Sequence, residues 1–303
     1  MTKAAVIGLG TMGPGIAATL ARGGMTVTAY DQSDEQRAKA PPMVALAQKV
    51  LGAMNVTEKG GTVSIEDSLE AALDGAELVV ETVPEKLEIK QAVFRQLDGL
   101  VSKDCVLASN TSGIPIGKLQ DGISNPGRVV GMHWSNPPHV IPMIEVIAGA
   151  ETAEPTVTWM CDTIKGLGLL PVVVQKDVPG FVENRILYAL LRECVDLVEQ
   201  GVIDAKGLDT CVSWGIGYKL SVIGPMALLD VAGLDIYQAV GSYLNADLST
   251  RSDVSPYVTD KTAKGQLGMK TGGGIFDYTP EEAAALRDER AKKLVAVRKA
   301  LES

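Results

Sequence analysis

Short apolar runs recur through the first half of the chain and alternate with longer amphipathic stretches. The runs predict β-strands at residues 3–7, 26–31, 62–65, 77–81, 105–108, 128–132, 145–147 and 170–174. Most stretches between them carry apolar residues three or four positions apart, which is typical of helices packed on one side. Strands that alternate with helices favour a mostly parallel sheet with helices on both faces, a doubly wound α/β fold.

The pattern changes at residues 177–180, Asp-Val-Pro-Gly. No convincing strand follows, and helices are expected at residues 181–200, 205–214, 226–230, 234–244 and 280–301. We therefore predict an α/β domain over residues 1–179 and an all-helical domain over residues 180–303. Residues 186–191 are almost continuously apolar, so their helix suits a subunit interface as well as a core.

One predicted helical segment contains a break. Residues 34–57 have a helical pattern that Pro41 and Pro42 interrupt. Proline lacks the amide hydrogen that a helix interior uses, and its ring clashes with the preceding turn. We expect a broken helical hairpin in this segment.

A glycine-rich turn follows the first strand. It consists of Gly8, Leu9, Gly10, Thr11, Met12 and Gly13. A helical pattern and a second strand come next, and this strand ends in Asp31. This is the G-x-G-x-x-G fingerprint of a dinucleotide-binding Rossmann domain, in its required context of strand, turn, helix, strand and acid. Gly8 permits the turn, Gly10 lets the backbone approach the pyrophosphate, and Gly13 allows close packing of helix and strand.

Asp31 indicates which dinucleotide is bound. Its carboxylate can accept hydrogen bonds from both ribose hydroxyls. A 2′-phosphate would be repelled by this charge, and no arginine directly follows Asp31. The expected cofactor is therefore NAD rather than NADP.

The chain has only two histidines, His133 and His139. His133 ends a predicted strand, where open α/β sheets form their ligand crevice. Glu145 opens the next apolar run and can turn back toward it. Histidine suits proton transfer near neutrality, and a carboxylate behind it can stabilise the imidazolium. The pair is a candidate base with its orienting partner; a strand-end histidine that only satisfies a backbone carbonyl is the alternative.

Four small polar residues follow the strand at residues 105–108, namely Ser109, Asn110, Thr111 and Ser112. A ligand crevice uses such residues, and so does any polar turn. The residues alone leave both interpretations open.

Composition and charge exclude several classes of function. The 303 residues include 28 Lys and Arg and 37 Asp and Glu, for a net charge of −9, with no basic cluster. Such a chain is a poor binder of nucleic acid or of an anionic membrane. No apolar run reaches the ~20 residues of a membrane helix. The spacing of the four cysteines favours neither a disulfide scaffold nor a metal site. We expect a cytoplasmic protein that acts on a small molecule and holds no metal ion.

Taken in order, these segments resemble the 3-hydroxyacyl-CoA dehydrogenase family along nearly the whole chain. The matching stretches are residues 8–13, 79–81, Glu85 with Lys90, residues 109–112 and 133–137, Glu145, residues 179–181 with Asn184 and Arg185, and residues 224–225 and 270–272. Several motifs in the right order are more specific than a lone glycine fingerprint.

The resemblance implies an NAD-dependent dehydrogenase that forms a homodimer through its helical domain. It implies that His133 is the general base and Glu145 its partner, and that Ser112 and Asn184 bind the reacting oxygen. Besides the glycine turn and Asp31, the positions matched to cofactor contacts are Glu85, Lys90, Asn110, Asn136 and Lys270. Without the resemblance, Lys90 would be interpreted as an ordinary solvated lysine.

Departures from the family pattern bear on the substrate. CoA-using members carry a lysine-rich helical hairpin after the acid of the second strand. Here residues 38–57 hold only Lys39 and Lys49, with Ala47 and Met54 at expected CoA contacts. A phosphorylated nucleotide needs cations, so a CoA thioester is not expected.

The segment at residues 134–143, which replaces the usual aromatic pair with Trp134-Ser135, is similar to a CoA-independent branch. That branch oxidises carboxylated pyridine aldehydes in vitamin B6 degradation, with the aldehyde hydrate as the alcohol. His139 and Arg185 are candidates to meet the substrate carboxylate. A partly exposed loop histidine and a structural ion pair, respectively, are the alternatives.

Other functions stay open. They are a short-chain L-3-hydroxyacyl-CoA dehydrogenase, a carnitine- or gulonate-type 3-hydroxy acid dehydrogenase and, more remotely, a non-enzymatic crystallin-like protein. The β-hydroxyacid dehydrogenases, by contrast, use a lysine on the helix after the domain boundary. Residues 180–190 contain no lysine, which argues against that family.

Overall fold

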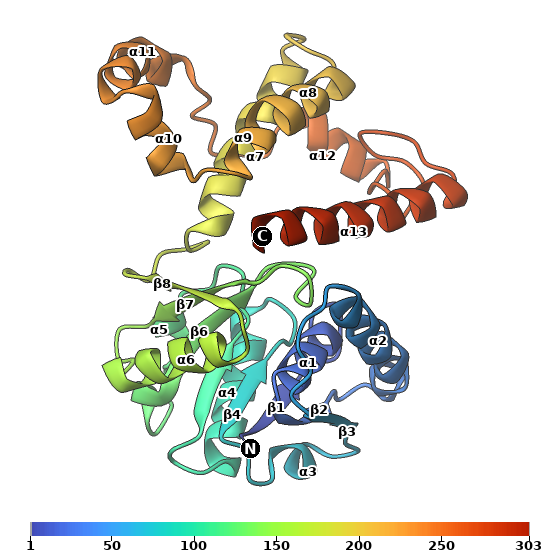
Figure 1. Cartoon of the computed structure of the whole chain (residues 1–303), viewed down its shortest axis with the longest axis vertical. Helices are drawn as coiled ribbons and strands as arrows, with labels where there is room; N and C mark the ends of the chain where they lie inside the picture. The colour runs from blue at the N-terminus through green and yellow to red at the C-terminus, as the bar shows by residue number, and fades with distance from the viewer. Residues whose placement is uncertain (1, 303) are drawn as a thin grey trace. The chain divides into compact units, whose positions relative to one another are not determined.

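The computed structural model describes residues 2–302 and divides into two compact units, Met1–Arg185 and Ile186–Ser303. The first unit is an α/β structure and the second is helical (Figure 1). This confirms the predicted fold class.

The first unit contains one sheet of eight strands in the order β3-β2-β1-β4-β5-β6-β7-β8. The strands are β1 (Lys3–Ile7), β2 (Thr26–Tyr30), β3 (Thr62–Ile65), β4 (Leu78–Glu81), β5 (Val106–Ser109), β6 (Val129–Trp134), β7 (Met143–Ala148) and β8 (Leu170–Val174). All neighbours are parallel except β6 and β7. Only residues 135–142 join these two strands, too few for the crossover of a dozen or more residues that a parallel pair requires.

Helices cover both faces of this sheet. They are α1 (Gly13–Arg22), α2 (Asp34–Ala53), α3 (Leu69–Leu73), α4 (Leu87–Leu100), α5 (Ile116–Leu119) and α6 (Glu154–Gly166), with a short 3-10 turn η1 (Pro126–Arg128). The side chains of β1 alternate between two cores because successive residues of a strand point to opposite faces. Ala4 and Val6 pack with α1 and α6, while Ala5 and Ile7 pack with α3, α4 and α5.

The predicted break at Pro41 and Pro42 is wrong, because α2 runs through both prolines as one helix. The two rings lie on its exposed side. Its buried residues recur three or four positions apart, and the helix packs against α1. They are Ala40, Val44, Ala47 and Leu51. This continuous buried stripe stabilises the helix despite the amide donors that proline lacks.

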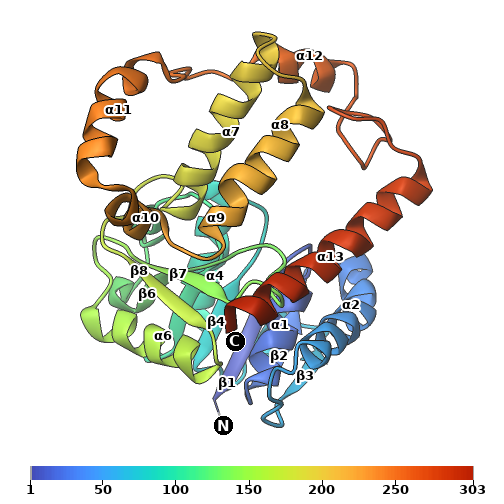
Figure 2. The same cartoon turned by 45° about the horizontal axis from the view of Figure 1, so that its top comes forward.

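The second unit contains helices and short turns. Its elements are α7 (Glu183–Glu199), which begins in the first unit, α8 (Ala205–Cys211), the π-helical turn η2 (Val212–Gly217), α9 (Tyr218–Leu220), α10 (Pro225–Ala232), α11 (Leu234–Asp247), α12 (Pro256–Ala263) and α13 (Pro280–Glu302). Gly233, with φ 98°, joins α10 to α11 at a sharp angle (Figure 2). Among its described residues, β pairing is limited to isolated bridges at Gly268–Gly273 and Gly273–Asp277.

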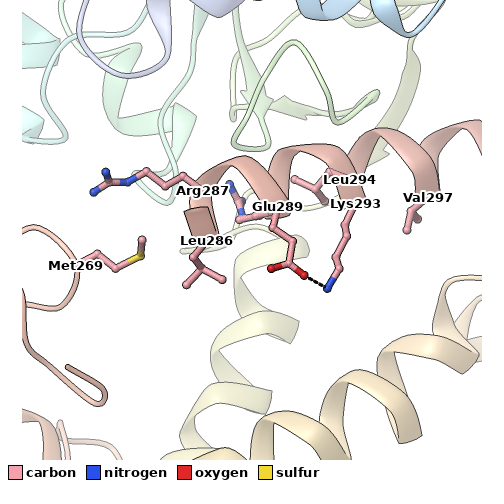
Figure 3. A pocket seen from close by; sticks show the side chains of 8 residues that line it. Met269, Leu286, Arg287, Glu289, Lys293, Leu294 and Val297 are labelled. Atoms are coloured by element: carbon pink, nitrogen blue, oxygen red, sulfur yellow. Dashed lines mark ion pairs between the residues drawn. The ribbon is translucent and has the colours of Figure 1, made fainter. Parts of the chain in front are cut away.

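A groove of about 420 Å³ runs along α13 in the helical unit. Leu286, Lys293 and Val297 line it at spacings typical of one helix face, and Met269 lies across from them in the preceding loop (Figure 3). An ion pair of 2.6 Å joins Lys293 to Glu289. This helix carries the charged pattern that the sequence predicts for residues 280–301.

Within residues 2–302, no single helix is long and apolar enough to cross a membrane. Ala205–Leu220 and Pro225–Ala232 pass that test of length and composition only as a pair bent by 87°.

Candidate active site

The glycine turn between β1 and α1 has the geometry that the fingerprint predicts. Gly8 adopts φ 106°, which favours glycine. A Cβ atom on Gly13 would lie 2.0 Å from the carbonyl oxygen of Gly8, so the turn and the helix are in direct contact. A Cβ on Gly10 would meet nothing within 4 Å. The open space beside Gly10 fits the pyrophosphate of a dinucleotide.

Asp31 lies just after β2 and faces this turn. Its Oδ2 accepts a hydrogen bond of 2.7 Å from the amide of Leu9, and its Oδ1 accepts one of 2.8 Å from the amide of Ser33. Each carboxylate oxygen has further acceptor capacity, which ribose hydroxyls can use.

An arginine, Arg37, lies close to Asp31 in space although none directly follows it in the chain. Its Nη1 donates to the backbone oxygen of Asp31 over 2.7 Å, and its other nitrogen pairs with Asp34. The guanidinium lies 5.6 Å from the centre of the Tyr30 ring. The sequence interpretation missed Arg37, because one turn of helix separates it from the acid.

His133 and Glu145 are directly opposite each other in the antiparallel pair of β6 and β7. Nδ1 of His133 lies 2.7 Å from Oε2 of Glu145. Both side chains are buried, with exposed fractions of 5% and 1%. The sequence could not show whether His133 and Glu145 touch, and the structure shows that they do.

The other oxygen of Glu145 binds the start of α7. Oε1 accepts hydrogen bonds from the amides of Val182, at 2.9 Å, and Glu183, at 3.1 Å. Burial works to raise the pKa of Glu145, but the hydrogen bonds from His133 and the two amides outweigh it, so the pKa lies below its ordinary value. The carboxylate is thus held in its charged form beside His133. The ring of Phe181 packs 5.7 Å from that of His133, centre to centre.

Ser112 and Asn184 are also brought together. Nδ2 of Asn184 donates to the backbone oxygen of Ser112 over 2.7 Å, and the amide of Ser112 donates to Oε1 of Glu85 over 2.9 Å. The hydroxyl of Thr111 binds the same Glu85 oxygen at 2.5 Å. Asn184 directly follows Glu183, so the helix start that holds Glu145 also holds the Ser112 loop.

Lys90 is not a solvated lysine, and that interpretation was wrong. It is 0% exposed, and its Nζ lies 2.7 Å from Oε1 of Glu81. It also donates to the backbone oxygen of Val83 over 3.1 Å and lies 3.4 Å from Oε2 of Glu85. Through its contacts with Val83 and Glu85, buried Lys90 stabilises the loop that carries Glu85.

The sequence interpretation did not single out Glu81 as an ionic partner. Burial raises the pKa of Glu81, while Lys90, the Ser109 hydroxyl and the amide of Val83 act in the opposite direction. The Ser109 hydroxyl donates to Oε2 of Glu81 over 2.7 Å. A single acidic residue at the end of a strand gave no signal of this network.

The remaining cofactor candidates lie in different places. Oδ1 of Asn110 accepts a hydrogen bond of 2.9 Å from the amide of Trp134, and this bond connects the end of β5 to β6. Asn136 is exposed in the loop after β6. Lys270 belongs to the helical unit, where it is exposed between α12 and α13. Their cofactor contacts stay predictions.

His139 and Arg185 differ in their surroundings. Nδ1 of His139 is buried without a hydrogen-bond partner in the described part of the chain, and burial lowers its pKa. Arg185 is exposed, and its Nη1 donates to the oxygen of Pro179 over 3.4 Å. Across residues 2–302, Arg185 forms no ion pair, so the structural role considered for it is not present.

Two functional candidates, Ser135 and Glu183, were not predicted from the sequence. The hydroxyl of Ser135, at the end of β6, donates to a carboxylate oxygen of Glu183. Glu183 is the first residue of α7 and its amide binds Glu145. An acidic residue at a helix start is common, so only the fold reveals that this one lies beside His133.

Comparison with known proteins places the chain in a family. Residues 3–178 match the family described as 3-hydroxyacyl-CoA dehydrogenase, NAD binding domain, and residues 180–278 match its C-terminal domain. The chain belongs to the 3-hydroxyacyl-CoA dehydrogenase family. It is an NAD-dependent dehydrogenase, as the glycine turn and the resemblance predict.

Individual relatives of this dehydrogenase differ in similarity. It is 62% identical over 301 residues to the 5-formyl-3-hydroxy-2-methylpyridine 4-carboxylate 5-dehydrogenase of Mesorhizobium japonicum, covering 98% of this chain and 97% of that protein. A solved structure of such an enzyme, described as an NAD+ dependent dismutase, matches with 60% identity and a TM-score of 0.98, over 100% and 99% of the two chains. The probable 3-hydroxybutyryl-CoA dehydrogenase of Deinococcus radiodurans is 34% identical over 287 residues, covering 91% and 100%.

Proposed function

We propose that this enzyme oxidises the hydrate of a small carboxylated pyridine aldehyde to the carboxylic acid. The observation that carries the proposal is the 62% identity, over 98% of the chain, to a relative named for such a substrate. The relative named for a CoA thioester is much less similar, at 34%.

The buried His133–Glu145 pair supports the chemistry. Glu145 is ionised, so the hydrogen between the two groups resides on Nδ1 and leaves Nε2 as a proton acceptor. Nε2 takes a hydroxyl proton of the gem-diol, and Glu145 stabilises the imidazolium that forms. NAD, when bound, would supply the acceptor for the hydride of the same carbon. The products are the carboxylic acid, NADH and one proton.

Ser112 and Asn184 are proposed to hold the reacting oxygen. One amide hydrogen of Asn184 is bound to the backbone oxygen of Ser112, which orients the side chain. The other hydrogen remains for a substrate oxygen. The exposed Ser112 supplies a hydroxyl from the neighbouring loop.

Helix α2 supports a substrate without CoA. Its cations are largely engaged, since Lys39 pairs with Glu35 and Arg37 with Asp34. Ala47 is buried against the core of the unit rather than facing solvent. Met54, just after the helix, is buried as well. This segment therefore offers few groups to bind the phosphates of CoA.

We further propose that the enzyme catalyses dismutation, because the solved relative with 60% identity is described as an NAD+ dependent dismutase. In the second half-reaction, the reduced cofactor would supply a hydride to a free aldehyde, and protonated His133 returns its proton to the aldehyde oxygen. The sum is two aldehydes and one water giving one acid and one alcohol. This cycle needs no outside oxidant.

The test supplies NAD with either a carboxylated hydroxypyridine aldehyde or a short 3-hydroxyacyl-CoA. Turnover of the aldehyde alone supports the proposal, and turnover of the thioester alone rejects it. Products are followed by NADH absorbance and by chromatography of acid and alcohol. Equal amounts of acid and alcohol with little net NADH indicate dismutation, whereas stoichiometric NADH and acid indicate oxidation only.

We also propose a homodimer formed through the helical unit. That unit exposes many large apolar side chains, including Tyr188, Trp214, Tyr218, Met226, Tyr237 and Tyr243. A second copy is the expected partner, since the resemblance implies a dimer. Sedimentation equilibrium should give twice the chain mass of 31.9 kDa. A monomer at assay concentration would reject this assembly.

A further inference from the structure

A second carboxylate beside His133, that of Glu183, has no role in the chemistry described above. A carboxylate oxygen of Glu183 lies within 4.8 Å of both a carboxylate oxygen of Glu145 and a ring nitrogen of His133. Two acidic side chains therefore lie beside one histidine. Like charges at this distance repel each other, and a cation near both offsets this repulsion.

Glu183 is held in place from two sides. Ser135 is buried and donates its hydroxyl hydrogen to the Glu183 carboxylate. The backbone amide of Glu183 donates to Oε1 of Glu145 over 3.1 Å. Ser135 lies two residues after His133 on the same chain segment, so these contacts form a closed ring through β6, β7 and the start of α7.

The charges around His133 come from these elements. Glu145 faces it from β7 and Glu183 from α7, while Phe181 contributes an uncharged ring. Within residues 2–302, no lysine or arginine forms an ion pair with either carboxylate. A proton on His133 is therefore the cation that this ring of contacts can supply to both acids.

We propose that Glu183, anchored by Ser135, is a positioning residue that acts with Glu145 to stabilise protonated His133. The inference rests on the proposed function in which His133 is the base. This role accounts for a glutamate at the first position of α7. There the Glu183 side chain binds Ser135 and the Glu183 amide binds Glu145. It assigns both groups to one task, proton uptake by the histidine.

The test uses the fact that the chain has only two histidines. The ring resonances of His133 and His139 are followed by NMR against pH in the full-length protein, with His139→Gln to assign them. In Glu183→Gln, which keeps an acceptor for Ser135 but loses the charge, the titration midpoint of His133 should fall by about one pH unit or more. Glu154→Gln is the matched control, because Glu154 also opens a helix, α6, and is exposed. That control should leave the midpoint unchanged.

A second variant tests the anchor. Ser135→Ala keeps both charges but frees the Glu183 side chain, so the midpoint should move in the same direction by a smaller amount. An unchanged His133 midpoint in Glu183→Gln would overturn the inference. If that variant does not fold, an unchanged midpoint in Ser135→Ala overturns it instead.

Activity separates this inference from the proposed function. The acidic limb of the kcat/KM profile with the pyridine aldehyde should move in Glu183→Gln as the NMR midpoint does. Absence of any aldehyde turnover in the wild type, together with a shifted NMR midpoint, would reject the substrate but keep the role of Glu183.

Discussion

At the scale of single residues, the chemistry depends on where charge is buried. Glu145 and Glu81 both lie on interior strands of the sheet and both are buried, yet their partners differ. Glu145 faces a histidine, the side chain that suits proton transfer, whereas Glu81 forms an ion pair with Lys90. The first pair suits proton transfer and the second suits support of a loop.

His133→Gln is expected to retain NAD binding and to lose turnover by about 10²- to 10⁴-fold, the usual contribution of a general base. The glycine turn after β1 and Asp31 after β2 form no hydrogen bond with His133, so affinity for NAD should persist. Steady-state kinetics and titration with NAD measure the two effects. A variant with near-normal kcat would remove His133 as the base.

Lys90→Met is expected to destabilise the protein by about 3–5 kcal/mol, because it leaves the Glu81 carboxylate buried without its cation. Urea unfolding of the variant measures the loss. The double variant Lys90→Met, Glu81→Leu removes both charges and should recover part of the stability. If the double variant is no more stable than the single one, the ion pair is not the source of the effect.

At the scale of elements, short connections decide the geometry of the site. The eight residues between β6 and β7 enforce an antiparallel pair, and the register then puts His133 opposite Glu145. The turn between β1 and α1, residues 8–12, is shorter still, and it brings the start of the helix against Gly8. These short connections thus set the positions of His133, Glu145 and the glycine turn.

Gly10→Ala and Gly13→Ala should separate binding from folding. An added Cβ at Gly10 meets no atom within 4 Å, so this variant should keep its melting temperature while losing NAD affinity at least about tenfold. At Gly13 the Cβ would lie 2.0 Å from the Gly8 oxygen, so that variant should melt at a lower temperature. Thermal unfolding and NAD titration measure both. Equal effects of the two variants on stability would contradict this assignment of the glycines.

At the scale of the whole molecule, buried or paired carboxylates couple stability to pH. Burial works to raise the pKa of Asp98, but the Ser124 amide and the Arg128 guanidinium outweigh it, so the pKa lies below its ordinary value of 3.8. Glu145 is shifted in the same direction. A carboxyl whose pKa is lowered by folding stabilises the native state above its unfolded pKa and loses this contribution as the pH falls through its folded pKa.

The free energy of unfolding should therefore fall as the pH drops below about 4. Asp98→Asn should lower stability at neutral pH and weaken the dependence on pH in the acidic range. Urea unfolding between pH 3 and pH 7 measures both slopes. A variant with the same acidic slope as the wild type would show that Asp98 does not contribute to it.

Much of the fold could be predicted because its signals are local. The alternation of apolar runs and helical stretches predicts the strands and most helices, and the glycine turn with Asp31 predicts the NAD-binding domain. The break predicted at Pro41 and Pro42 failed because propensity within a helix does not include packing against α1. Here a buried stripe of four residues outweighs two missing amide donors.

The sequence by itself determined the fold class, the cofactor and the candidate base, since these depend on patterns within a few residues or on motifs in fixed order. Only the tertiary structure decided that Lys90 is buried against Glu81, that Arg37 lies near Asp31, and that Glu183 stands beside His133. The physical reason is that these contacts join side chains from different elements. Their distances depend on how strands pair and where helices begin, which no short stretch of sequence specifies.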